Sequence, residues 1–172
     1  MVPRLERLYS VIEQQRHNLL ASLKNLSNEQ LNAHPPTKWS INQIIAHLIT
    51  AEALSVRYLN KKILGINEAN DSSLVEELKM ILLVASQRLP LKFKAPNVIV
   101  EQTSSETDIK KLSDEWIKTR VELKNILDRI ENKHLKRKIY KHVRVGMLNI
   151  QHALKFFLEH VNHHTPQIKK LI

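Results

Sequence analysis

The chain has 172 residues, of which 42% are hydrophobic, so it can bury a core of its own and global disorder is excluded. It has no cysteine, which excludes disulfides, thiolate metal sites and a cysteine nucleophile. Its 27 Lys and Arg outnumber its 17 Asp and Glu, and the resulting formal charge of +10 would attract anions. We expect one domain spanning residues 1–172.

The excess of basic residues does not by itself indicate a nucleic-acid surface. The densest basic run, 133–138 with Lys141 and Arg144, lacks interleaved aromatic side chains on which bases could stack. We therefore expect no nucleic-acid partner, and a basic anion-binding module is kept only as an alternative. The longest apolar run, 80–85, is too short to span a membrane, and charges interrupt the amino terminus. No membrane partner and a cytoplasmic location are expected.

The first half of the chain predicts three helices, each with a recognisable start. The first begins at Pro3, which is tolerated at a first helical position, and carries a stripe of apolar residues. Residues 27–30 form a capping box for a short helix that ends near Ala33. A second capping box at 40–43 opens a strong helix that runs to about Lys62 and is stopped by Gly65.

The second half predicts three more helices, separated by less regular segments. Asp71 or Ser72 caps a helix that ends near residue 87, and Pro90 and Pro96 frame an irregular stretch after it. A second helix begins at Ser105 or Thr107 and ends near Glu131. A basic linker follows over about 133–146, and the last helix is expected over about 149–171.

Histidines in the last predicted helix are the clearest chemical signal. His160 and His164 are four residues apart, so they project from one helix face and two ring nitrogens can converge on one metal ion. His47, near the start of the helix after Ser40, is the best third ligand, because antiparallel packing would bring all three to one end of a bundle. The alternative is a surface pair or a satisfied core histidine. His17, His34, His134 and His142 have no partner by spacing and are expected at the surface or in the core.

Several short motifs carry a resemblance to a known family. They are Trp39-Ser40 before a helix with His47-Leu48 and Glu52, Gly146-Met147-Leu148, Gln151, Ala153-Leu154, Phe157, and His160-x-x-x-His164-x-x-Gln167-Ile168. With these residues the chain resembles the DinB/YfiT-like metalloenzymes over its full length. The resemblance implies an all-α, up-down-down-up four-helix bundle with a long crossover between the second and third long helices. It also implies a divalent metal ion held by His47, His160 and His164.

The resemblance implies a metal-dependent enzyme that acts on a small-molecule substrate. Three neutral imidazoles leave coordination positions open, as in a catalytic site, and nitrogen ligands suit zinc, nickel, iron or manganese. Relatives suggest either S-transfer from a low-molecular-weight thiol or metal-assisted hydrolysis, and we favour transfer because no general base is evident. No catalytic residue is identified. A non-catalytic bundle with a structural or lost metal is the alternative, and a homodimer is expected by analogy.

Two further histidines lie close to the expected ligands in sequence. His163 is three residues from His160, and we expect it to point away from the ion or to support the ligands from outside. His152 lies two helical turns before His160 and is a candidate for the wall of the cavity.

Overall fold

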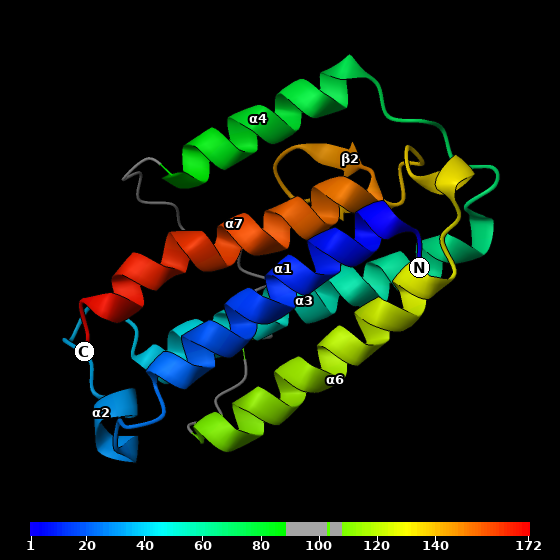
Figure 1. Ribbon diagram of the computed structural model, residues 1–172. Helices are drawn as coiled ribbons and strands as arrows, with labels where there is room; N and C mark the ends of the chain where they lie inside the picture. Colours follow the sequence, from blue (N-terminus) through cyan, green and yellow to red (C-terminus); the bar gives the residue numbers. More distant parts are fainter. Residues whose placement is uncertain (89–102, 104–107) are drawn as a thin grey trace.

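Four long helices form the body of the protein. The structure is a computed structural model that describes residues 1–88, 103 and 108–172. They are α1 (Pro3–Ser22), α3 (Ile41–Lys62), α6 (Ile109–Asp128) and α7 (Ile150–Lys169). Figure 1 shows α1 and α7 running in one direction and α3 and α6 in the other. The prediction of an all-α helical bundle is confirmed.

Shorter elements connect the four helices. They are α2 (Asn28–Asn32), the 3-10 turn η1 (Ile63–Gly65), α4 (Leu74–Arg88), the 3-10 turn η2 (Asn132–His134), and the strands β1 (Tyr140–His142) and β2 (Gly146–Leu148). The long connection between α3 and α6 includes α4, which packs along the outside of α7 (Figure 1). The features predicted at Pro90, Pro96, Ser105 and Thr107 lie outside the described residues. The described part of α6 begins at Ile109, and Asp108 caps it by accepting a hydrogen bond from the backbone N–H of Lys110.

Both predicted capping boxes are present, and one of them fixes the start of the helix that carries His47. Ser40 Oγ accepts the backbone N–H of Gln43 at 3.1 Å, and Gln43 Oε1 accepts the N–H of Ser40 at 2.8 Å. This reciprocal pair satisfies two donors that the first helical turn leaves without partners. His47 consequently lies in the second turn of α3, next to the apolar face.

A β-hairpin corrects the prediction of a basic linker over 133–146. Its antiparallel strands pair Tyr140 with Leu148 and His142 with Gly146. Tyr140 and His142 point inward while Lys141 is exposed, but three residues are too few for such an alternation to be distinguished from a loop. Gly146 has φ +78°, a conformation that glycine adopts without the strain a side chain would cause.

A buried ion pair links α3 to α6 inside the bundle. The Glu52 carboxylate accepts hydrogen bonds from Arg120 Nε at 2.8 Å and Nη2 at 2.7 Å, and from Trp116 Nε1 at 2.8 Å. Glu52 and Arg120 are each 1% exposed, so the pair is removed from water. Apolar side chains of all four long helices fill the interior around it. Among the described residues, no helix is both long and apolar enough to cross a membrane.

Candidate metal centre

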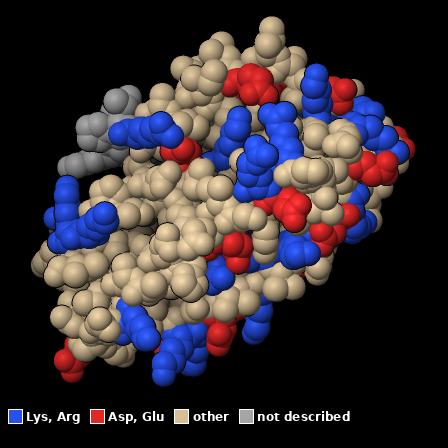
Figure 2. Space-filling view, in the orientation of Figure 1, with Lys and Arg blue, Asp and Glu red and all other residues tan. Residues whose placement is uncertain are grey.

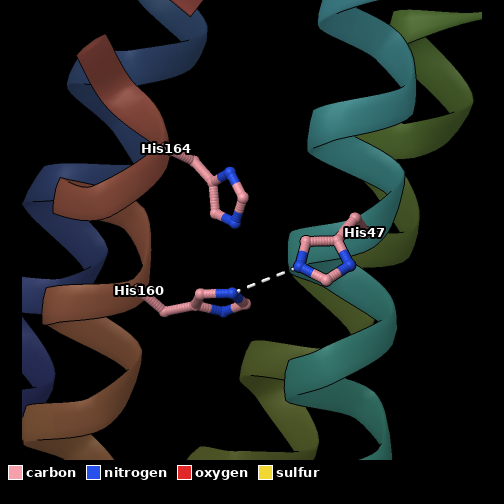
Figure 3. A group of neighbouring side chains, drawn as sticks. All are labelled: His47, His160 and His164. Carbon is pink, nitrogen blue, oxygen red and sulfur yellow. Dashed lines mark hydrogen bonds between the residues drawn. The ribbon is translucent and has the colours of Figure 1, made fainter. Parts of the chain in front are cut away.

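The structure brings together the three histidines that the sequence singles out. His47 comes from α3, whereas His160 and His164 come from successive turns of α7, and the three rings face one another (Figure 3). One ring nitrogen of each lies within 4.8 Å of the others. The ring centroids are 4.9 to 5.1 Å apart for all three pairs, so the cluster is nearly an equilateral triangle. The antiparallel neighbours α3 and α7 therefore produce the expected convergence.

Neighbouring side chains hold the three rings in place. Gln167 Oε1 lies 3.1 Å from His164 Nδ1, and since an amide oxygen only accepts, this nitrogen carries the hydrogen and Nε2 keeps a lone pair. The Trp39 ring lies 4.9 Å from the ring of His47, and Phe156 stacks on His160 at 5.2 Å. Trp39 thus borders the cluster.

Burial keeps the imidazoles of the cluster uncharged. Desolvation, followed by repulsion from neighbouring histidines, lowers the pKa of His47 to about 4 and that of His164 to about 3. The same causes lower the pKa of His160 well below its ordinary value. At neutral pH the three rings are therefore neutral, which is the state in which an imidazole nitrogen can bind a metal ion.

The spacing of the nitrogens suits a shared ion. His47 Nε2 and His160 Nε2 are 3.2 Å apart. Two imidazole nitrogens bound about 2.1 Å from one tetrahedral ion are separated by roughly 3.4 Å, which is close to this distance. The Nδ1 atoms of His47 and His160 are buried and have no hydrogen-bond partner among the described residues. The donor set thus consists of three neutral nitrogens, and it suits zinc or another first-row divalent metal ion.

The other two histidines considered for the site are turned towards α4. His163 Nδ1 lies 2.7 Å from the backbone oxygen of Gln87, to which it must donate. His152 Nε2 lies 2.9 Å from Glu77 Oε1, so this ring helps to attach α4 to α7 and does not join the triad.

A fourth imidazole near the triad was not predicted. His142, on β1, packs against Phe156 at 4.6 Å, and the same Phe156 ring stacks on His160. His142 Nδ1 accepts the backbone N–H of Arg144 at 3.3 Å, which leaves the hydrogen of the neutral ring on Nε2. Burial lowers the pKa of His142 to about 4, with a smaller effect from Arg144. No spacing in the sequence links His142 to the three clustered histidines, because only the hairpin brings it close to them.

Fold and cluster together define a helical bundle with a buried three-histidine centre of the kind that holds a divalent ion. The family model of the DinB superfamily matches residues 12–168, and the chain belongs to this superfamily. The resemblance in the motifs is thereby confirmed. No curated protein and no solved structure matched the chain.

Proposed function

We propose that this protein is a divalent-metal-dependent enzyme that acts on a small molecule, with His47, His160 and His164 as the ligands of its ion. The observation that carries the proposal is the convergence of three neutral imidazole nitrogens from two different helices. Assembling them requires burial of polar rings, and a bound cation would compensate for that desolvation.

The number of ligands favours a catalytic ion over a structural one. Among the described residues the cluster consists of three histidines, without a further histidine, aspartate or glutamate. Structural zinc sites are almost always closed by four protein ligands, whereas catalytic sites keep a position open for water or substrate. Three ligands therefore fit a site that exchanges the molecule at its open position.

The acidic residues nearest the ligands in sequence are engaged elsewhere. Glu52 is bound by Arg120 and Trp116, and Glu159 is bound by Arg88 at 2.6 and 2.9 Å. Neither carboxylate is free to act as a general base for an attacking water. A bound divalent ion would lower the pKa of a thiol or of water, and a thiol, with an ordinary pKa of about 8.5, needs far less assistance than water at about 15.7. This comparison supports transfer of a low-molecular-weight thiol to an electrophile over hydrolysis.

Metal content is the first test of the proposal. Protein purified without a histidine tag is expected to contain a stoichiometric first-row divalent ion by elemental analysis. His160→Ala should abolish that content and leave the helical circular dichroism largely intact, whereas His17→Ala, a change at an exposed position of α1, should retain the ion. Unchanged metal content in His160→Ala would refute the ligand assignment.

The reaction is tested separately with the metal-loaded protein. A panel of low-molecular-weight thiols is offered with an electrophilic acceptor, and the loss of free thiol is followed against His160→Ala as background. Turnover that requires the thiol supports transfer. Cleavage of ester or amide substrates without thiol consumption would instead establish hydrolysis. An ion that cannot be exchanged, and whose removal unfolds the protein, would indicate a structural site.

A further inference from the structure

A proline weakens the part of α7 that carries His160 and His164. Pro166 lies inside this helix, two residues after His164. A proline has no backbone N–H, so the backbone oxygen of Asn162, four residues earlier, loses its helical hydrogen bond. The proline ring also crowds that oxygen, which favours a kink. The segment that must hold two imidazoles one turn apart therefore has less internal support than an uninterrupted helix would give it.

Helix α4 is attached to this segment at two positions that alternate with the proposed ligands. Arg88, the last residue of α4, donates to the two carboxylate oxygens of Glu159 from Nε at 2.9 Å and from Nη2 at 2.6 Å. One turn later, His163 Nδ1 donates to the backbone oxygen of Gln87 at 2.7 Å. Figure 1 shows α4 lying along the outside of α7. The end of α4 thus holds α7 at the residues that directly precede His160 and His164.

Helix α1 is attached to the same turn at two other positions. Gln15 Nε2 donates to the backbone oxygen of Leu158 at 3.1 Å and to Asn162 Oδ1 at 2.7 Å. Asn162 is the residue whose backbone oxygen lies opposite Pro166 in the helical ladder. The weakened turn is therefore tied to a neighbouring helix on each side, which indicates that its position is determined from outside α7.

We propose that the carboxyl-terminal end of α4 braces this turn of α7 and thereby sets the spacing of His160 and His164. Arg88 and Glu159 are then positioning residues of the metal centre, a role that rests on the ligands proposed above. A guanidinium that binds one carboxylate through two N–H groups fixes direction as well as distance. The Glu159 side chain is only 8% exposed, so its carboxylate depends on Arg88 more than on water for its hydrogen bonds. Residues outside a cluster can orient its ligands in this way.

Binding of Co²⁺ tests the brace, because the visible absorption of this ion reports both its affinity and the geometry of its ligands. Arg88→Gln should weaken Co²⁺ binding by about 10-fold and alter the spectrum, with the helical circular dichroism unchanged. The matched control is Lys79→Gln, which removes the same charge from a partly exposed position of α4 and should not weaken binding.

The sign of the effect separates the brace from long-range electrostatics. Basic side chains are spread over the face that Figure 2 shows, and the chain has a formal charge of +10. Removal of one positive charge lessens the repulsion of a cation, so electrostatics alone would make Co²⁺ bind slightly more tightly to both variants. Weaker binding to Arg88→Gln can therefore be attributed to the lost contact with Glu159. Equal or tighter binding would overturn the proposal.

The variant Pro166→Ala provides a second test. Alanine has the N–H that proline lacks, so the bond to the Asn162 oxygen can form and the turn can support itself. In this background Arg88→Gln should weaken Co²⁺ binding by less than about 3-fold. Equal losses in the two backgrounds would show that the brace does not compensate for the missing helical bond, and would overturn this account.

Amide hydrogen exchange of the metal-free protein follows the brace without the ion. Arg88→Gln should speed exchange at the backbone amides of residues 161–164 by about 10-fold relative to Lys79→Gln, because local opening costs less once the turn is untied. Faster exchange with unchanged Co²⁺ affinity would make Arg88 a structural contact only and would refute its positioning role. Wild-type protein that binds no Co²⁺ would instead refute the three ligands, and this role of α4 with them.

Discussion

At the scale of single residues, the imidazole rings of the histidine triad are uncharged in the folded protein. An unfolded histidine has a pKa of about 6.5, whereas His47 and His142 in the folded chain have a pKa of about 4. Between these values the unfolded chain binds more protons than the folded one. The stability that neutral burial provides is therefore complete above pH 6.5 and is lost as the pH falls towards 4.

This linkage predicts an acid-sensitive protein. The free energy of unfolding of the metal-free chain should fall by at least about 2 kcal/mol between pH 7 and pH 4.5, because several buried histidines must become charged. Urea denaturation at the two pH values measures the difference. Metal affinity should decline over the same range, since protons compete for the ligand nitrogens. Equal stability at both pH values would contradict the burial of neutral rings.

A second residue-scale prediction concerns Gln167, which fixes the hydrogen of His164 on Nδ1. Gln167→Leu should weaken metal binding by about 10-fold, because the ring loses the acceptor that orients it. Gln167→Glu keeps an acceptor at the same place and should bind metal at least as well as the wild type. Competition with a chelating indicator gives both affinities, and equal affinity of the leucine and glutamate variants would show that this hydrogen bond has no role.

At the scale of elements, one buried carboxylate, that of Glu52, links α3 to α6 through hydrogen bonds. Glu52 accepts three hydrogen bonds from Arg120 and Trp116, and both Glu52 and Arg120 are almost fully buried. The other carboxylate near Arg120, that of Glu13, lies farther away, at 3.6 Å from Nη1. Since α3 carries His47, its position relative to its neighbours determines whether the third ligand reaches the other two. The Glu52 carboxylate thus helps to position α3 relative to α6.

Removing this carboxylate should be costly. Glu52→Ala leaves the buried Arg120 with only the more distant carboxylate of Glu13, 3.6 Å from its Nη1, and should lower the free energy of unfolding by about 3 kcal/mol. The matched control is the exposed pair of Lys124 and Asp128 on α6, where Lys124→Ala should cost no more than about 0.5 kcal/mol. Urea denaturation measures both, and a loss of similar size in the two variants would mean that the buried pair contributes little.

At the scale of the whole molecule, the helices were the part of the fold that the sequence could predict. Capping residues such as Ser40 and breakers such as Gly65 mark helix ends locally, and the structure begins and ends α3 close to where they indicate. The sequence did not predict the hairpin, because strands of three residues are too short to show a measurable alternation of apolar and polar residues. The outward face of α4 was also beyond prediction, because both sides of this helix are apolar and the sequence does not say which one packs on α7.

The candidate site was predictable only in part for a similar reason. The spacing of His160 and His164 is a local signal, but His47 is 113 residues away from His160, and only the packing of α3 on α7 joins them. At the level of the sequence, the resemblance to the family is the signal that groups His47 with His160 and His164. Neither the spacing of His142 nor a family motif predicted that it lies near the triad, and only the fold places it there.

We expect the helical bundle to remain folded when the proposed metal ion is removed. Apolar side chains of all four long helices form the core, and this core extends well beyond the three histidines. Treatment with a chelator is therefore expected to remove the metal and lower the melting temperature while leaving the far-ultraviolet circular dichroism nearly unchanged. Collapse of the helical signal on chelation would show instead that the ion is required for folding.

The wide separation of the ligands along the chain has a consequence for biosynthesis. A nascent polypeptide carries only His47 until α7 has emerged from the ribosome, and a lone imidazole holds a divalent cation weakly. If the three histidines bind an ion as we propose, the ion can bind only after the helices have assembled, and a fragment truncated before residue 160 should not bind it. Occupancy of the centre would in that case report that translation had passed this point and that the helices had docked.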